Sequence, residues 1–268
     1  CKTPVPLPPA TGIKEPTMTH ALPLHTPEGW PLLGRETELA RLRAWLTEED
    51  GAFMITGGPG VGKSALAWAA ANTFAPTLFV SLADASSAES MITAIANAAS
   101  IDLRGSNSIE KASGQLGIAL AGHLVVLDTA EHLLRECEAA APMWVKAGIR
   151  LLITSRISSA HIAGLCIEGL PQSSAGAMFK MLADRVAPGA IREEDDTPLQ
   201  SLLEQVEGIP LAISLLAERV GLLSPKQILE RFSVLFQLPS NAGRSVRHRS
   251  LEAAIRVIRL VAHATAGG

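Results

Sequence analysis

The sequence contains no tyrosine, and its other aromatic residues amount to only 4% of 268 residues. This scarcity argues against a base-stacking platform for nucleic acid. The formal net charge is −3, so no overall basic field would draw the chain onto nucleic acid or anionic lipid. No stretch approaches the 18 or so uninterrupted apolar residues of a membrane-spanning helix. We therefore expect neither direct nucleic-acid binding nor membrane insertion.

Cysteine is also scarce. Cys1, Cys137 and Cys166 show no CxxC spacing, which excludes a disulfide scaffold and argues against a zinc site. No two histidines stand at a metal-ligand spacing. This usage fits a reducing cytosol, and we expect a cytoplasmic location. A first residue of Cys rather than Met is typical of a mature bacterial lipoprotein, or of a fragment of a longer chain. The intracellular nucleotide inferred below favours the fragment.

Apolar material is abundant, because 47% of the residues are hydrophobic and 18% are charged. This balance excludes disorder of the whole chain. Residues 1–31 are rich in proline and lack hydrophobic periodicity, so we expect an extended, disordered linker there. Beyond Leu32, short apolar runs alternate with helical patterns. The patterns predict helices over 36–47, Lys63–Thr73 and about 87–99, and strands over Ala52–Thr56, Thr77–Leu82, Leu124–Asp128, Leu151–Thr154 and Leu165–Glu168.

The strand runs are continuous rather than alternating, which indicates burial on both faces and hence a parallel sheet flanked by helices. From about residue 172 only helical patterns follow. They predict helices over Ala175–Val186, Pro198–Val206, Pro210–Val220 and Pro225–Phe236. Thr197 and Ser224, each before a proline, are typical N-cap residues. The acidic run Glu193–Asp196 is expected to be a solvated turn beside a helix start.

A glycine-rich motif lies between a predicted strand and a predicted helix. It matches GxxxxGK[ST] and consists of Gly57, Gly58, Pro59, Gly60, Val61, Gly62, Lys63 and Ser64, with Ala65 next in the chain. Such a loop wraps an anion with inward-pointing amides at a helix N-terminus. Lys63 supplies a charge for the β- and γ-phosphates, and the Ser64 hydroxyl is placed to bind Mg²⁺. A chance glycine-rich turn is the alternative, and the strand–helix context disfavours it.

The strand Leu124–Asp128 ends in a carboxylate, which is the form of a Walker B motif. Ligands of open α/β sheets lie beyond the carboxyl ends of the strands, so Asp128 is expected to hold the Mg²⁺ of the loop. Glu131 is our candidate for orienting or deprotonating a water. Its alternative is a first-turn carboxylate that serves a helix dipole. We assign His132 a structural role.

Arg156 follows the strand Leu151–Thr154 and the hydroxyl pair Thr154-Ser155. If that strand neighbours the first strand, these side chains face the γ-phosphate at about one strand spacing, roughly 4.8 Å, from the loop. Arg156 would then report the third phosphate as a cis-acting arginine finger. An ordinary surface arginine is the alternative, and the two Walker motifs disfavour it.

The ordered set of motifs resembles the signal-transduction ATPases with numerous domains, the STAND class, which includes the NB-ARC and NACHT switches. The likeness spans roughly 32–256. Besides the loop, its segments are Leu32-Leu33-Gly34-Arg35, the Walker B run from Leu127 to Leu133, Thr154-Ser155-Arg156 (similar to sensor 1) and Gly208-Ile209-Pro210 (similar to the GxP motif). The Walker B run resembles that of bacterial regulators fused to LuxR-type or SARP-type DNA-binding domains.

The resemblance implies that Arg35 and Pro210 border the adenine and that Arg156 contacts the γ-phosphate. From the residues alone, Pro210 is only a first-turn proline and Arg35 an exposed residue before a helix. The resemblance also implies an ASCE-type P-loop NTPase fold: an α/β parallel sheet flanked by helices, followed by a small all-helical domain.

We thus expect a linker at 1–31, a nucleotide-binding domain at 32–171, a helical domain at 172–240 and a truncated winged-helix start at 241–268. The basic cluster Arg244, Arg247 and Arg249 is expected to be a solvated turn. The run from Arg247 to Ile255 resembles the entry to the family's winged-helix domain, but Val257–Gly268 replaces the expected continuation. The family's winged helix and repeat-built sensor domain are missing, so a truncation or a disturbed reading frame near 257 is expected.

The leading functional hypothesis is a slowly hydrolysing ATP/ADP switch that uses Mg²⁺. It would be a module of a multidomain regulator, and we expect that regulator to control transcription. Its partners would be the sensor and output domains of the parent protein and, in one nucleotide state, copies of itself. Two alternatives stay open: an oligomeric AAA-type remodelling ATPase, and a binding module that does not hydrolyse. A GTPase is disfavoured because no NKxD-type motif follows the Walker B strand.

Overall fold

The computed structural model describes residues 32–48 and 51–237. The predicted linker at 1–31, the predicted winged-helix start at 241–268 and the basic cluster Arg244, Arg247 and Arg249 lie outside the described residues. Among the residues described, no helix combines the length and the apolar character that crossing a bilayer requires.

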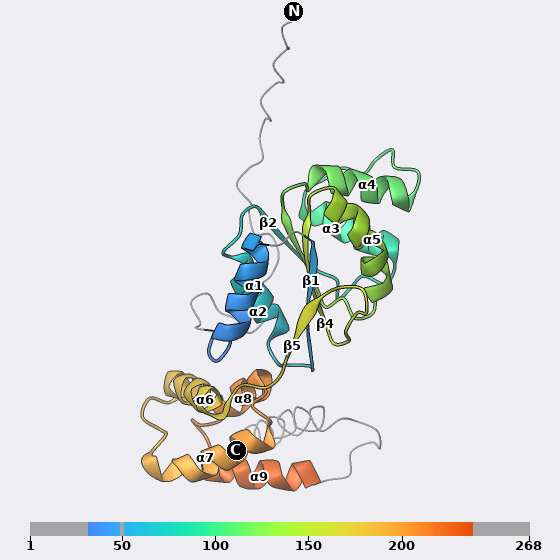
Figure 1. Ribbon diagram of the computed structural model, residues 1–268. Helices are drawn as coiled ribbons and strands as arrows, with labels where there is room; N and C mark the ends of the chain where they lie inside the picture. Colours follow the sequence, from blue (N-terminus) through green and yellow to red (C-terminus); the bar gives the residue numbers. More distant parts are fainter. Residues whose placement is uncertain (1–31, 49–50, 238–268) are drawn as a thin grey trace, which may run out of the picture.

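A parallel sheet of five strands forms the centre of the first part of the chain (Figure 1). The strands are β1 (Ala52–Gly57), β2 (Thr77–Ser81), β3 (Leu124–Asp128), β4 (Arg150–Ser155) and β5 (Gly164–Ile167). Their order is β2-β3-β4-β1-β5, and every neighbouring pair is parallel. All five predicted strands are confirmed, each within one residue at either end. The position expected for Arg156 requires that the strand before it, β4, neighbours β1. These two strands do pair.

Helices cover both faces of the sheet, as its continuous apolar strands predict. On one face, α1 (Glu36–Glu48) and α2 (Lys63–Ala71) pack against alternate strand residues such as Ile55 and Val126. On the other face, α3 (Ala88–Ala98), α4 (Ile109–Ala119) and α5 (Leu134–Lys146) pack against the residues in between, such as Met54 and Val125 (Figure 1). We call residues 32–167 the sheet unit.

Residues 172–237, here called the helical unit, contain α6 (Gln172–Val186), the 3-10 turn η1 (Glu193–Asp195), α7 (Asp196–Gln205), α8 (Pro210–Ala217) and α9 (Pro225–Gln237). They enclose a core of their own around Phe179 and Phe232. Ser224 caps α9 as predicted, because its hydroxyl accepts a hydrogen bond from Gln227 N (3.4 Å) while Gln227 Oε1 accepts one from Ser224 N (3.0 Å).

The start of α7 differs from the prediction. The helix begins at Asp196, so Thr197 lies within its first turn and is not its N-cap. The acidic run is not merely a solvated turn either. Glu193–Asp195 forms η1, and the buried Asp195 accepts a hydrogen bond from Arg192 N at 3.0 Å. A carboxylate that satisfies backbone amides at a helix start explains both differences.

Candidate functional site

The phosphate loop, residues 57–63, joins the end of β1 to the start of α2. The residue before the helix is Gly62, at φ +98°, and no side chain caps the helix. The first backbone hydrogen bond that closes α2 runs from Leu66 N to Gly62 O at 3.0 Å. The amides of Lys63, Ser64 and Ala65 therefore have no acceptor within the helix. This end of α2 provides the donors and the positive dipole end that an anion needs.

The Lys63 side chain folds back over the phosphate loop. Its Nζ donates to the carbonyl oxygens of Gly57 (3.0 Å) and Gly58 (2.9 Å). Burial lowers the pKa of Lys63 below that of an ordinary lysine, and the Arg156 charge lowers it further, while Glu131 and Asp128 act in the opposite direction. Lys63 thus lies within electrostatic range of every other charged residue that the sequence assigns to catalysis.

Four hydroxyl or carboxylate side chains meet at the carboxyl ends of β3 and β4, and one of them, Thr129 Oγ1, donates to Asp128 Oδ2 at 3.3 Å. Ser64 Oγ donates to Asp128 Oδ2 at 3.0 Å, and Thr154 Oγ1 donates to Asp128 Oδ1 at 2.6 Å. Thr154 Oγ1 also accepts a hydrogen bond from Thr129 N at 2.9 Å. The sequence predicts the pairing of Ser64 with Asp128, and the part of Thr154 in holding the carboxylate is new. These oxygen donors fit Mg²⁺, which prefers one or two protein ligands together with waters and phosphate oxygens.

Within the described residues, no group of three His, Cys, Asp or Glu side chains gathers as a metal cage. The Ser64–Asp128 pair supplies two oxygen ligands, which suits a hard cation that is shared with a phosphate ligand.

Glu131 and Arg156 form an ion pair beside this cluster, with 2.8 Å between Arg156 Nε and Glu131 Oε1. The other carboxylate oxygen, Glu131 Oε2, is buried without a hydrogen-bond partner. Because α5 begins only at Leu134, Glu131 is not a first-turn carboxylate of that helix, and this alternative is wrong. Nε2 of His132 lies 2.6 Å from the Ala85 carbonyl oxygen, in agreement with the structural role expected for it.

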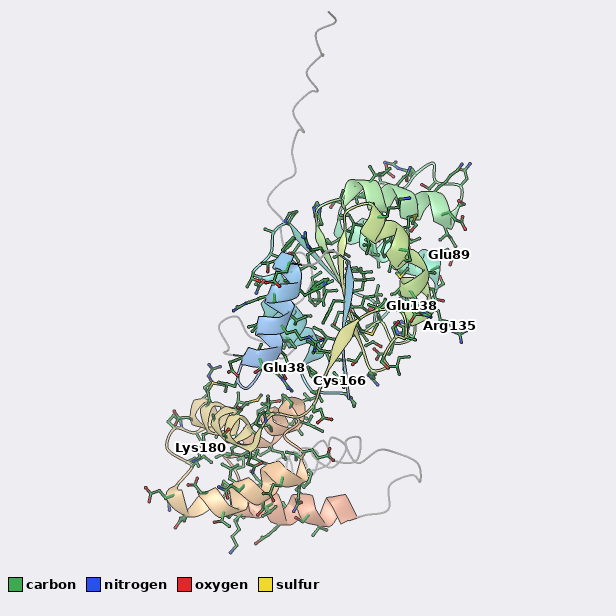
Figure 2. The ribbon with its side chains drawn as sticks, in the orientation of Figure 1. Glu38, Glu89, Arg135, Glu138, Cys166 and Lys180 are labelled. Atoms are coloured by element: carbon green, nitrogen blue, oxygen red, sulfur yellow. The ribbon has the colours of Figure 1, made fainter. Side chains whose placement is uncertain are left out.

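Arg35 is not the exposed residue that its local sequence suggests, since only 4% of it is accessible. Its guanidinium donates through Nη2 to the carbonyl oxygens of Val61 (3.1 Å) and Glu168, and through Nη1 to Glu38 Oε1 (2.9 Å). Figure 2 labels Glu38 at the end of the sheet unit that faces the helical unit. Local sequence could not predict this burial, because two of the three partners lie 26 and 133 residues away in the chain.

The helical unit contacts the phosphate loop at the start of α8. Leu211 N donates to Gly60 O at 3.2 Å, and the Pro210 ring faces Gly62, where an added Cβ would lie 4.0 Å from Pro210 Cγ. At Gly60, whose φ is +74°, an added Cβ would lie 2.9 Å from Leu211 Cβ. Only glycine fits there without displacing α8. Pro210 therefore lies beside the loop.

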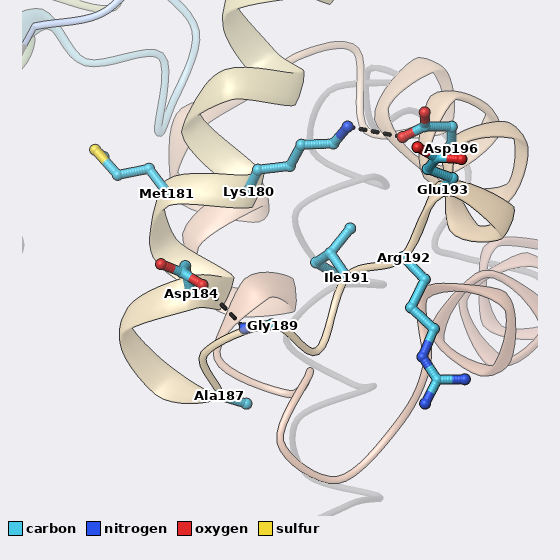
Figure 3. Close-up of a pocket in the computed structure, with 9 residues that line it drawn as sticks. All are labelled: Lys180, Met181, Asp184, Ala187, Gly189, Ile191, Arg192, Glu193 and Asp196. Atoms are coloured by element: carbon cyan, nitrogen blue, oxygen red, sulfur yellow. Dashed lines mark hydrogen bonds and ion pairs between the residues drawn. The ribbon is translucent and has the colours of Figure 1, made fainter.

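A surface hollow of about 430 Å³ lies elsewhere in the helical unit, between α6 and the segment that leads to η1 (Figure 3). Three of the charged side chains that line it have partners: Lys180 Nζ lies 2.7 Å from Asp196 Oδ1, and Asp184 Oδ1 accepts a hydrogen bond from Gly189 N. No residue of the phosphate loop lines this hollow.

Comparisons with known proteins place this geometry in context. No protein-family model matches the chain. An uncharacterized protein of Mycobacterium tuberculosis (strain ATCC 25618 / H37Rv) is 28% identical over 228 residues, which cover 80% of this chain and 57% of that protein. A candidate HTH-type transcriptional regulator of the same strain is 33% identical over 141 residues, covering 49% of this chain and 16% of that protein. The chain spans little more than half the length of the first of these relatives.

Among solved structures, a Walker-type ATPase of Pyrococcus abyssi superposes with a TM-score of 0.55 at 15% sequence identity, covering 77% of this chain and 73% of that one. An identity this low reports on the fold alone. Together with the strand order, in which β4 lies between β1 and β3, the likeness establishes that the chain has an α/β fold of the ASCE-type P-loop NTPases, followed by a small all-helical part.

Proposed function

We propose that the chain binds ATP and ADP with Mg²⁺, hydrolyses ATP slowly, and acts as a nucleotide switch within a larger regulator of the STAND kind. The observation that carries the proposal is the Ser64–Asp128–Thr154 cluster. It lies at the carboxyl ends of neighbouring parallel strands, next to a helix N-terminus with free donors. A polar cluster in this place suits a phosphate-bound cation, because ligands of open α/β sheets collect beyond the strand ends.

Each residue of the site has a defined task in this proposal. The amides at the start of α2 and the Lys63 ammonium bind the phosphates, and Ser64 and Asp128 hold Mg²⁺. When bound, Mg²⁺ neutralises charge on the β- and γ-phosphate oxygens. Glu131 orients the attacking water through its unpaired Oε2.

Three further residues contact other parts of the nucleotide. Arg156 moves from Glu131 Oε1 toward the γ-phosphate and stabilises charge there. By the family resemblance, Arg35 and Pro210 border the adenine.

The role as a switch draws on the contact between the phosphate loop and α8. Leu211 N donates to a backbone oxygen of the phosphate loop, so a change in the conformation of the loop acts directly on the start of α8. ATP and ADP can therefore favour different placements of the helical unit. The regulatory setting is supported by the relative named as an HTH-type transcriptional regulator. We propose a transcriptional regulator as the parent protein, in the cytoplasm, with sensor and output domains as its partners.

Nucleotide binding is tested by isothermal titration of ATP and ADP, with Mg²⁺, into the wild-type chain, Lys63→Ala and the control Lys111→Ala. Lys111 is an exposed lysine of α4, remote in sequence from the loop. We expect wild type and Lys111→Ala to bind alike and Lys63→Ala to lose binding by at least roughly tenfold. Equal binding by all three proteins would refute the phosphate site.

Hydrolysis and the switch need separate measurements. Glu131→Gln should lower phosphate release by roughly 10²-fold or more while ATP still binds. If Glu131→Gln releases phosphate at the same slow rate as wild type, the chain is a binding module that does not hydrolyse ATP. A fast rate that rises with protein concentration would indicate an oligomeric remodelling ATPase. Denaturing the protein purified without added nucleotide should release ADP, and release of GTP would contradict the proposal.

A further inference from the structure

Arg35 connects the start of α1 to two segments that are distant in sequence, the phosphate loop and the chain just after β5. Its guanidinium binds Val61 O in the phosphate loop, Glu168 O just after β5, and the Glu38 carboxylate on α1. A guanidinium is planar and offers five N–H donors, so one side chain can satisfy several acceptors in fixed directions. A buried charge is retained only when it is paired and hydrogen-bonded in this way.

The Glu168 carbonyl belongs to the segment that leads from β5 into α6, residues 168–171, here called the joining segment. This segment is itself bound to the turn before α8, because Leu170 N donates to Gly208 O at 2.8 Å. At Gly169, an added Cβ would collide with the carbonyl oxygen of Glu207, so the two backbones are in contact. A displacement of the joining segment therefore also displaces the start of α8.

These contacts close a ring. From the phosphate loop, Gly60 O binds Leu211 N, and the chain runs back from Leu211 to Gly208. Gly208 O binds Leu170 N, and Glu168, two residues earlier, returns through Arg35 to Val61 O beside Gly60. Apart from the two hydrogen bonds of Arg35, the links are backbone hydrogen bonds and the chain itself. Arg35 is therefore the side chain through which substitution can open the ring.

We propose that Arg35 is a positioning residue that couples the phosphate loop to the joining segment, so that a nucleotide bound at the loop also orders the start of the helical unit. This inference rests on the proposed function, because it needs a nucleotide at the loop. It assigns Arg35 a task separate from bordering the adenine, carried by its hydrogen bonds to Val61 O and Glu168 O.

A lysine cannot replace the arginine in this role. Its ammonium is a compact point charge on a flexible stem, whereas the guanidinium fork spans two carbonyl oxygens on different segments and a carboxylate on a third. Arg35→Lys retains the buried positive charge beside Glu38 but loses the simultaneous link to Val61 O and Glu168 O. This variant separates coupling from the mere presence of a cation.

The test is hydrogen–deuterium exchange of the whole chain with and without ADP and Mg²⁺, followed in peptides that cover 57–66 and 164–171. Four proteins are compared: wild type, Arg35→Lys, Arg35→Ala, and the control Arg43→Ala, which removes an exposed arginine from α1, the helix that begins just after Arg35. In wild type and Arg43→Ala, ADP well above its Kd should slow exchange roughly tenfold or more in both peptides. Because Arg35 is also proposed to border the adenine, each variant is measured with ADP well above that variant's own Kd, determined by titration. In both Arg35 variants, slowing should then persist in 57–66 and fall at least roughly threefold in 164–171.

The outcomes separate the two proposals. If ADP slows exchange nowhere in wild type, the proposed nucleotide site fails. If it slows 57–66 but leaves 164–171 unchanged in wild type, or slows 164–171 equally in Arg35→Lys, the coupling by Arg35 is overturned although the nucleotide site stands. Should Arg35→Ala fail to fold, Arg35→Lys decides. Glu38→Gln, which keeps both carbonyl contacts, should behave like wild type.

Discussion

Replacing Thr154 by valine changes the side chain very little in size, but it should lower both the stability of the chain and the effect of Mg²⁺ on ATP binding. Valine has nearly the same shape as threonine, so the packing of this fully buried position stays intact. The hydroxyl that valine lacks makes two hydrogen bonds, donating to Asp128 Oδ1 at 2.6 Å and accepting from Thr129 N at 2.9 Å. The substitution therefore removes one support of the carboxylate and leaves a backbone amide without its acceptor.

The cost follows from these two bonds. A hydrogen bond to a charged group contributes about 1.5–3 kcal/mol, and a buried donor left unpaired costs about 1–3 kcal/mol. We expect Thr154→Val to lower the free energy of unfolding by about 3 kcal/mol. Thr154→Ser keeps the hydroxyl and loses one methyl group, for which about 1 kcal/mol is expected. The difference of about 2 kcal/mol corresponds to about 4–8 °C in Tm for a chain of this size.

Thermal unfolding followed by circular dichroism compares wild type, Thr154→Ser and Thr154→Val. Titration of ATP with Mg²⁺ and with EDTA adds a second measurement. Thr154→Val should lose most of the gain in affinity that Mg²⁺ gives, because Asp128 loses the short hydrogen bond that fixes its Oδ1, whereas Thr154→Ser should keep it. Equal Tm values for the two variants, or a full Mg²⁺ effect in Thr154→Val, would refute the assigned role of this hydroxyl.

Three further predictions follow from other contacts. Gly60→Ala should lower Tm by several degrees more than Gly122→Ala. Both positions have a positive φ, but of the two only Gly60 faces a neighbouring side chain within 4 Å. Equal Tm shifts in calorimetry would contradict the packing of α8 on the loop. ATP affinity should fall as the pH rises and should do so below the pH at which an ordinary lysine titrates, because burial lowers the pKa of Lys63 and the neutral amine cannot bind phosphate. Lys63→Arg, which stays charged, should titrate without this fall. Burial raises the pKa of Cys137 to about 12, whereas Cys166 is exposed. Iodoacetamide near neutral pH should therefore label Cys166 in the folded chain and Cys137 only after denaturation. Peptide mapping of the labelled chain measures this difference.

The sheet could be predicted from sequence because its signal is local. Central strands buried on both faces are continuous apolar runs, and β3 is buried at all five positions. The edge strand β5, with alternate residues exposed, gives the weaker pattern expected of a strand covered on one face. The sequence patterns predict no helix over α4 or α5. Gly114 and Gly117 lie inside α4 and Pro142 lies inside α5, and these residue types weaken a helical pattern.

The candidate site was predictable where a motif encodes it. The loop and Asp128 follow from spacing and strand context, and parallel pairing then brings Ser64 to Asp128. The mutual pairing of Glu131 and Arg156 and the burial of Arg35 depend on contacts between distant segments, which no local pattern reports. The identity of the ligand and the tasks of these residues remain predictions that the binding and exchange measurements address.

The two separate cores have an energetic consequence. The sheet unit and the helical unit each bury their own apolar residues, and the described links between them are a few hydrogen bonds around the phosphate loop and the joining segment, together with the packing of Pro210 and Leu211 against the loop glycines. At about 1 kcal/mol for each such bond, parting the units costs a few kcal/mol. That is close to the 1–3 kcal/mol by which one ligand commonly alters an allosteric equilibrium. In the proposed function, replacing ATP by ADP would then suffice to reverse which arrangement of the two units predominates, without unfolding either unit.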